Sequence, residues 1–194
     1  MLEKKDITGI ILAGGKSSRM GTDKGFLKLN DKLFIEHSID ALKALVSEII
    51  IISNSNDYDV FGYKRINDKV ENSGPLAGIY TGLIHSETEY NLVLSCDIPL
   101  IKTELLKLLI EADEEKYDII QFESNGKMTP LIALYKKNCT NTFYNLLNSG
   151  ERRLQYAINQ CEFKRIHLKK EHDYLITNVN TNQELKDLKN AYNY

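Results

Sequence analysis

Residues that could bind an anion are concentrated in one stretch near the start of the chain, GIILAGGKSSRMGTDKGFLKL (residues 9–29). Gly14 and Gly15 permit positive φ and a close approach of the backbone, so consecutive N–H groups can point into one concavity. The same stretch supplies cations and hydroxyl groups, namely Lys16, Ser17, Ser18, Arg19, Thr22, Lys24 and Lys28. This density of donors and positive charges fits a triphosphate better than a single phosphate.

The spacing of the glycines excludes two familiar phosphate loops. A P-loop requires G-x-x-x-x-G-K-[ST], but here five residues separate Gly15 from Gly21, and Thr-Asp follows. The dinucleotide pattern G-x-G-x-x-G is absent from the stretch. The alternative is an ordinary glycine-containing loop with a solvated basic face, and the number of donors favours a nucleotide over it.

Asp97 is the strongest candidate for a metal ligand. It ends the apolar run in NLVLSCDIPL, where a carboxylate must be partnered or metal-bound if it is buried. A triphosphate brings Mg²⁺, which one or two carboxylates usually hold together with phosphate oxygens. The alternative role of Asp97 is to cap a turn before Pro99. Asp68, in RINDKVENSGPLAG, is a second acidic candidate.

Predicted strands and helices alternate over the first ~115 residues, which is typical of a parallel sheet with helices on both faces. Strands are expected over residues 7–12, 48–53 and 91–95, and helices over 34–46, from Pro75, and from an N-cap at Thr103 to Ala112. The later elements expected are strands over 117–123, 129–135 and 163–168, a helix over 139–148, and a last helix opened by a capping box of Thr181 and Glu184.

The carboxyl ends of parallel strands form the edge where such sheets bind their ligands. The glycine-rich stretch, Asn54 and Asp97 each follow a predicted strand. We therefore expect these three to lie together at one edge of the sheet.

Composition limits the class of protein further. The chain has 194 residues, 42% of them hydrophobic and 27% charged, which fits one domain over residues 1–194. A formal net charge of −2 argues against nucleic-acid binding, and no run approaches the ~18 apolar residues of a membrane span. Cys96, Cys139 and Cys161 are widely spaced, which is typical of free thiols in a reducing compartment and favours a cytoplasmic protein.

Several motifs together carry a family resemblance. LAGGKSSRMGTDK resembles the signature of nucleotidyltransferases that activate a phosphate-bearing acceptor with a nucleoside triphosphate. GPLAG and NVNT narrow the resemblance to the molybdenum cofactor guanylyltransferase (MobA) family. The matching segments run in the family's order over nearly the whole chain, and they are LAGGKSSRMGTDKGFLKL, SGPLAGIYTGL, LSCDIPL, TPLIALY, GERRL and NVNTNQEL.

The resemblance implies a three-layer αβα, Rossmann-like nucleotidyltransferase fold with a mostly parallel sheet. It also implies transfer of GMP from GTP to the terminal phosphate of molybdenum-bearing molybdopterin, with release of pyrophosphate and with Mg²⁺ as cofactor. The N-terminal part would bind the nucleotide and the C-terminal part the molybdopterin. Protein partners implied in the same way are the molybdenum insertase and molybdoenzyme apoproteins or their chaperones.

The family's functional residues can be carried over by position. The expected nucleotide contacts are Leu12, Ala13, Gly14, Gly15, Lys24, Asn54, Asp68 and Asp97. The expected catalytic residues are Arg19, Lys24 and Asp97, of which Asp97 would also bind Mg²⁺. The expected molybdopterin contacts are Asn178, Asn180, Arg152 and Arg153.

Two other functions stay open at this point. A cytidylyltransferase acting on molybdopterin or on a sugar or polyol phosphate would share the first motif, but such relatives tend to lack GPLAG. A non-catalytic molybdopterin- or nucleotide-binding chaperone would keep the glycines and NVNT but could dispense with a metal carboxylate. The presence of Asp97 favours catalysis.

Overall fold

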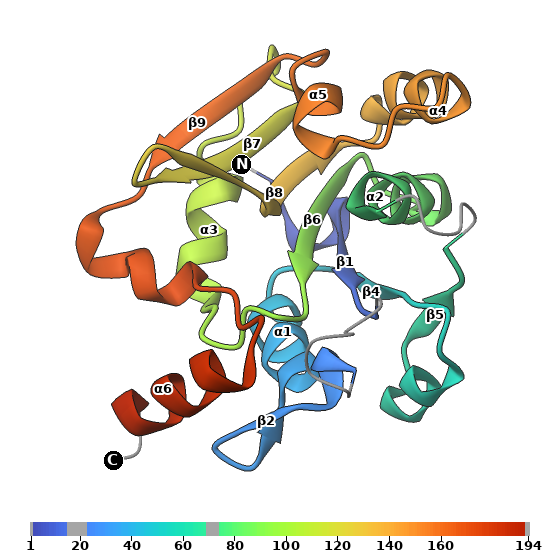
Figure 1. The fold of residues 1–194 in the computed structure, drawn as a ribbon. Coiled ribbons are helices and arrows are strands. Elements are labelled where there is room, and N and C mark those ends of the chain that lie inside the picture. Colours follow the sequence, from blue (N-terminus) through green and yellow to red (C-terminus); the bar gives the residue numbers. More distant parts are fainter. Residues whose placement is uncertain (1, 15–22, 69–73, 193–194) are drawn as a thin grey trace.

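A seven-stranded sheet forms the centre of the computed structural model, which describes residues 2–14, 23–68 and 74–192 (Figure 1). The strands are β1 (Ile7–Leu12), β4 (Glu48–Ile52), β5 (Lys64–Ile66), β6 (Tyr90–Ser95), β7 (Ile119–Ser124), β8 (Lys127–Lys136) and β9 (Phe163–His167). Their order across the sheet is β5-β4-β1-β6-β8-β7-β9. Strand β8 is antiparallel to both of its neighbours, whereas the other neighbouring pairs are parallel.

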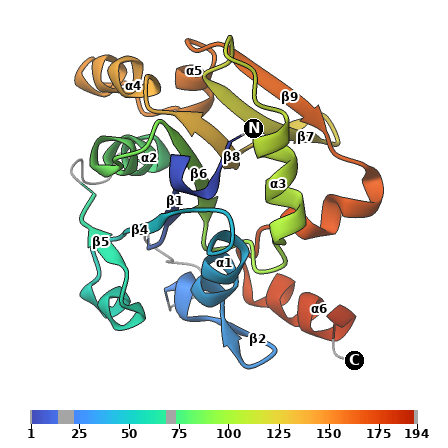
Figure 2. The same ribbon diagram turned by 180° about the vertical axis from the view of Figure 1, so that it is seen from behind.

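Helices cover both faces of this sheet (Figures 1 and 2). One face carries α1 (Phe34–Leu42) and α3 (Thr103–Glu111). The other face carries α2 (Gly74–His85), α4 (Cys139–Asn148) and α5 (Leu154–Ile158). The last helix, α6 (Asn182–Tyr192), packs through its apolar residues near the start of α1. This arrangement confirms the expected three-layer α/β fold with a mostly parallel sheet.

The two hydrophobic cores follow from the two-residue period of a strand, which sends successive side chains to opposite faces. In β6, Leu92 and Leu94 join the core under α1 and α3, while Val93 joins the core under α2, α4 and α5. In β1, Ile11 and Ile10 divide in the same way. Strands buried on both faces have continuous apolar sequences, and this pattern is why they could be predicted from the sequence.

The boundaries of α1 and α3 differ from those expected. The apolar pattern predicts a helix to residue 46, but α1 ends at Leu42 because the chain must turn back to pair β4 with β1. Leu45 and Val46 are buried in that turn, so they are apolar because they belong to the core and not because the helix continues through them. Thr103 is the first residue of α3 instead of its N-cap, and its hydroxyl donates to the Ala41 carbonyl at 3.0 Å.

Short elements escaped the sequence-based prediction. They are β5, α5, the hairpin of β2 (Lys28–Leu29) and β3 (Lys32–Leu33), and the 3₁₀ turns η1 (Lys4–Asp6), η2 (Lys24–Phe26), η3 (Asn56–Phe61) and η4 (Lys170–Ile176). An element of a few residues is too short to show a helical or alternating period. In the parts of the chain that the structure describes, no helix has the length and apolar character to cross a membrane.

Candidate active site at the carboxyl edge of the sheet

The ends of β1, β4 and β6 meet at one edge, as the rule for parallel sheets predicts. Backbone hydrogen bonds continue the pairing one residue past the strands: Ala13 N–H donates to the Ile52 carbonyl at 3.0 Å and Cys96 N–H donates to the Leu12 carbonyl at 3.1 Å. The residues that follow each strand are therefore held side by side. Among them are Gly14, which follows β1, and Asp97, which follows β6.

Gly14 is a position that only glycine suits. Its φ is +97°, and a Cβ there would lie 3.1 Å from the Ser53 hydroxyl, which follows β4. The Ser53 Oγ in turn accepts a hydrogen bond from Ser55 N–H at 3.2 Å. The backbone at the end of β1 thus lies close against the turn after β4, as expected for a backbone that approaches a ligand.

Gly15 and Arg19 lie outside the described residues, together with the rest of residues 15–22. Their expected phosphate contacts stay predictions. Lys24, which is also expected to contact the nucleotide, is described and is the centre of the site.

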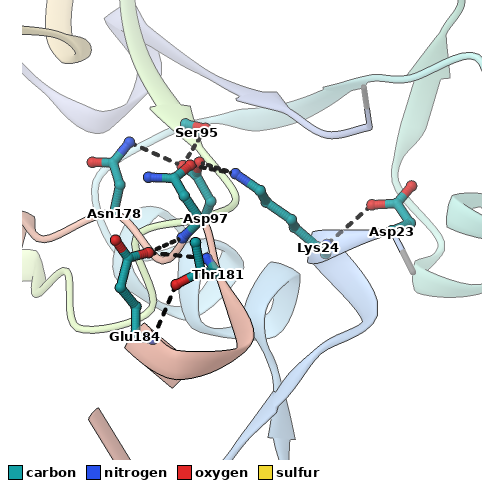
Figure 3. Close-up of polar contacts among 9 residues, drawn as sticks. Asp23, Lys24, Ser95, Asp97, Asn178, Thr181 and Glu184 are labelled. Carbon is teal, nitrogen blue, oxygen red and sulfur yellow. Dashed lines mark hydrogen bonds and ion pairs between the residues drawn. The ribbon is translucent and has the colours of Figure 1, made fainter. Parts of the chain in front are cut away.

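The Lys24 ammonium joins two distant parts of the chain (Figure 3). Its Nζ donates to Asp97 Oδ2 at 3.0 Å and to Asn180 Oδ1 at 2.6 Å. Asp97 is only 8% exposed, so its charge is balanced mainly by this lysine and by nearby hydrogen-bond donors. We refer to Lys24, Asp97 and Asn180 as the Lys24 cluster.

The carboxylate of Asp97 is fixed by further donors. Ser95 Oγ donates to Asp97 Oδ1 at 2.7 Å, and Asn178 Nδ2 reaches the same oxygen at 3.4 Å. The Asp97 carbonyl accepts from Val179 N–H at 2.9 Å. Asp97, Asn178 and Asn180 were all expected in the site, and the structure brings them together.

The burial of Val179 explains why its two neighbouring asparagines face the site. Val179 packs in a small apolar cluster with Leu29 of β2 and Phe34 of α1. The side chains on either side of the anchored Val179 contact the site: Asn178 reaches Asp97, and Asn180 accepts from Lys24.

The start of α6 holds the NVNT segment in place. Glu184 Oε2 accepts from Asn180 N–H at 2.6 Å and from Thr181 N–H at 3.0 Å, and Glu184 N–H donates to Thr181 Oγ1 at 3.1 Å. This is the predicted capping box. The Asn180 N–H bond is the main cause that lowers the pKa of Glu184, and the nearby Lys24 charge lowers it further.

Asp23 and Tyr58 support the turn that carries Lys24, and neither residue was predicted to belong to the site. Tyr58 OH donates to Asp23 Oδ1 at 2.6 Å, and Gly25 N–H donates to the same oxygen at 3.1 Å. Tyr58 is fully buried, and burial raises its pKa, so the hydroxyl stays a donor. A Cβ on Gly25 would lie 2.2 Å from the Tyr58 oxygen, which explains why a glycine follows Lys24.

The residues expected on the nucleoside side also meet. Asn54 Oδ1 accepts from Asp68 N–H at 2.8 Å, and Thr81 Oγ1 of α2 lies 3.4 Å from Asp68 Oδ1. Arg65 of β5 donates to the Ser53 carbonyl at 3.1 Å. These bonds tie the turn after β4 to the segment that leads toward α2.

Arg152 and Arg153 lie elsewhere, at the start of α5. The Arg152 guanidinium donates to the carbonyls of Leu147 and Glu151, both at 2.8 Å, and Arg153 pairs with the Glu151 carboxylate at 2.6 Å. The Arg152 carbonyl lies 4.0 Å from where a Cβ on Gly74 would stand, so this pair borders the start of α2. The α5 helix covers the opposite face of the sheet from α1, near which α6 packs.

Asp97 fits a metal ion that arrives with a nucleotide. Among the described residues no three His, Cys, Asp or Glu side chains gather into a group that could hold a metal. Mg²⁺ bound with a triphosphate needs only one or two carboxylates, because phosphate oxygens and water complete its shell. The Lys24 ammonium at Asp97 Oδ2 shows that this carboxylate accepts a cation at that point.

Cys96, beside Asp97, is not suited to act as a nucleophile. Burial is the main cause that raises its pKa to about 12, and the neighbouring Asp97 charge adds to the shift. A thiol with such a pKa is uncharged near neutral pH, whereas the thiolate is the reactive form. Cys96 is therefore not expected to form a covalent intermediate, and the Lys24 cluster offers electrostatic stabilisation and positioning.

The family model that matches this chain describes an NTP transferase domain, so the chain belongs to the class of the nucleotidyltransferases. The structure superposes on a molybdopterin-guanine dinucleotide biosynthesis protein A from Archaeoglobus fulgidus with a TM-score of 0.80, at 20% identity and over 95% of this chain and 97% of that one. A CMP:2-keto-3-deoxy-manno-octonic acid synthetase solved with CTP gives 0.75 at 15% identity, over 96% and 98%. At these identities the likeness shows the fold.

Sequence comparison defines the family. The chain belongs to the family described as "MobA-like NTP transferase domain", which matches residues 9–163. It is 41% identical over 182 residues to a probable molybdenum cofactor guanylyltransferase of Flavobacterium johnsoniae, covering 94% of this chain and 96% of that one. It is 32% identical to a molybdenum cofactor guanylyltransferase of Vibrio campbellii, over 95% and 96%. The family resemblance expected from the motifs is confirmed.

Proposed function

We propose that this protein transfers GMP from GTP to the terminal phosphate of molybdenum-bearing molybdopterin and releases pyrophosphate. The observation that carries the proposal is the Lys24 cluster. It joins the carboxylate expected to hold the metal to the asparagine expected to contact the acceptor, through one cation that can serve both. The names of full-length relatives at 32–41% identity support guanine as the base and the molybdenum cofactor as the acceptor.

The reaction is an in-line displacement at phosphorus. A terminal phosphate oxygen of the acceptor attacks the α-phosphorus of GTP, a new P–O–P bond forms, and the bond to the β-phosphate oxygen breaks to release pyrophosphate. The attacking oxygen is already an anion at neutral pH, so no strong general base is required. The main barrier is the meeting of two anions, which preorganised cations lower.

The described residues divide this work among them. Lys24 neutralises the transferring phosphate, and its position depends on Asp23 and Tyr58 behind it. The backbone of Leu12, Ala13 and Gly14 contacts the guanine and ribose. We assign Mg²⁺ to Asp97, where the bound ion would neutralise phosphate oxygens and the departing pyrophosphate.

The remaining contacts are assigned by position. Asn54 and Asp68 line the nucleoside side, where they already hydrogen-bond to each other. Asn178 and Asn180 bind the pterin side of the acceptor. The guanidinium groups of Arg152 and Arg153 already hydrogen-bond to the end of α4 and to Glu151, so we assign these arginines a secondary role in binding the acceptor phosphate.

The biological setting follows from the acceptor. Molybdenum-loaded molybdopterin would come from the molybdenum insertase, and the dinucleotide would pass to molybdoenzyme apoproteins or their chaperones. Free thiols suit a cytoplasmic enzyme.

A pyrophosphate-release assay with loaded acceptor, Mg²⁺ and each of GTP, CTP, ATP and UTP tests the proposal. We expect release with GTP that depends on both acceptor and metal. Release with CTP alone would replace the proposal with a cytidylyltransferase. Tight GTP binding without release would identify a binding chaperone instead.

A further inference from the structure

Two of the cysteines lie against each other at a distance from the candidate active site. Cys139 is the first residue of α4, and Cys161 lies in the turn between α5 and β9. Cys161 packs against the core cluster that contains Cys139, and each thiol is close enough to shift the pKa of the other. They are 22 positions apart in sequence, so tertiary structure alone brings them together.

Asp118, just before β7, fixes the backbone on both sides of this pair. Its N–H donates to the Glu162 carbonyl at 2.7 Å, and its Oδ2 accepts from Glu162 N–H at 3.1 Å. Its Oδ1 accepts from the Asn138 side chain at 2.5 Å, and its carbonyl lies 3.6 Å from Cys139 Sγ. The chain neighbours of both cysteines are thus bound to one residue.

The two thiols have different environments. Cys139 is 2% exposed, and the neighbouring Cys161 thiol together with burial raises its pKa. Cys161 is partly exposed, and the neighbouring Cys139 thiol lowers its pKa. An accessible, more acidic thiol beside a second thiol is the arrangement of cysteines that oxidise reversibly. Cys96 is buried near Asp97, and burial raises its pKa.

We propose that Cys139 and Cys161 form a reversible disulfide when the protein meets a hydroperoxide. The Cys161 thiolate attacks the peroxide oxygen and becomes a sulfenic acid, while the O–O bond breaks and an alcohol or water leaves. The Cys139 thiol then attacks the Cys161 sulfur and passes its proton to the departing hydroxyl group, so that the S–O bond breaks and water leaves. A dithiol reductant restores both thiols.

The disulfide would lie at the opposite edge of the sheet from the Lys24 cluster. Strands β6 and β7 are both antiparallel to β8 and so run in the same direction. Asp118 precedes β7 at the amino edge, whereas Asp97 follows β6 at the carboxyl edge. The cross-link would tie the start of α4 to the start of β9 without touching the site.

Mass spectrometry of the full chain tests this inference independently of the proposed function. After treatment with hydrogen peroxide and alkylation under denaturing conditions, we expect loss of two hydrogens per monomer and a peptide linking Cys139 to Cys161. Cys96 should be alkylated, and dithiothreitol should restore all three thiols. The oxidised protein should melt on the order of 5 °C higher, because the bridge restricts the unfolded chain.

Single variants make the assignment specific. Cys96→Ser should form the same cross-link as the parent chain, as the matched control. In Cys139→Ala, dimedone should trap a sulfenic acid at Cys161, and Cys161→Ala should leave Cys139 reduced. Sulfinic acid at Cys161 of the parent chain, covalent dimers, or two unmodified thiols after peroxide treatment would each overturn the inference.

Discussion

At the scale of single residues, the Lys24 ammonium lies where we propose that the metal and the triphosphate bind. It contacts one oxygen of a nearly buried carboxylate and the amide oxygen of Asn180 at once. A metal ion can reach Asp97 Oδ2 only if this ammonium moves, and incoming phosphates give it a new partner. In the proposed mechanism the ion pair between Lys24 and Asp97 is therefore a preformed part of the site and not only a structural salt bridge.

Replacement of Asp97 by asparagine keeps the shape of the side chain and removes its charge. We expect Asp97→Asn to lower turnover by about 10²–10³-fold, the cost of losing one preorganised electrostatic contact. The melting temperature should change little, because the asparagine oxygen can still accept from Ser95.

Asp57→Asn is the matched control. Like Asp97, the Asp57 carboxylate accepts a hydrogen bond from the hydroxyl of a serine two residues earlier, here Ser55 at 2.8 Å, but Asp57 is exposed. We expect near-normal turnover for this control, and near-normal turnover for Asp97→Asn as well would contradict the role of Asp97.

At the scale of elements, two short segments hold the Lys24 cluster from opposite sides. The η3 turn supplies Tyr58, which fixes Asp23 ahead of Lys24. The first turn of α6 supplies Glu184, which fixes the backbone of Asn180. In the described parts of the chain the ammonium donates to Asp97 and Asn180 and to neither of these side chains, so each is a positioning residue whose loss should act through geometry.

Removal of the Tyr58 hydroxyl should loosen the turn that carries Lys24. We expect Tyr58→Phe to cost about 1–2 kcal/mol of unfolding free energy, the usual effect of losing one buried hydrogen bond, and to lower kcat as well. Tyr135→Phe is the control, because that buried hydroxyl donates to the Pro130 carbonyl at 2.8 Å in the other core. Equal kcat for the two variants would argue against positioning by Tyr58.

The capping box of α6 should make stability depend on pH. The lowered pKa of Glu184 means that its carboxylate stabilises the folded state above its unfolded pKa, about 4.3. That contribution disappears as the pH falls through the lower folded pKa. The melting temperature of Glu184→Gln should therefore lie below that of the parent chain at neutral pH and approach it in acid.

Glu104→Gln, in the first turn of α3, is the comparison for the Glu184 variant. It removes a similar charge from a helix start without a capping box. A difference between parent and Glu184→Gln that does not change between neutral and acidic pH would refute the assignment.

At the scale of the whole molecule, one sheet separates two cores and supplies the site from its carboxyl edge. We expect both cores to unfold together, because β1 and β6 contribute side chains to each. Leu94→Ala and Leu83→Ala, one in each core and both fully buried, should each cost about 2–5 kcal/mol and shift one common transition. Two transitions in circular dichroism, each shifted by only one variant, would show separate units.

The sequence predicted most of this arrangement, and the omissions have physical reasons. The strands buried on both faces, Gly14 and Asp97 follow from local patterns and from the geometry of parallel sheets. The contacts of Tyr58 with Asp23 do not, because 35 positions separate them and no local pattern links them. The ion pair between Arg153 and Glu151 was also not predicted, since a charge pair at the surface produces no periodic pattern in the sequence.

The most direct test of the account is a crystal structure with Mg²⁺ and a non-hydrolysable GTP analogue. We predict the guanine and ribose against the ends of β1 and β4, phosphates in contact with Lys24, and the metal on Asp97. A nucleotide bound elsewhere, with the contact from Lys24 to Asp97 Oδ2 still intact at 3.0 Å, would contradict it.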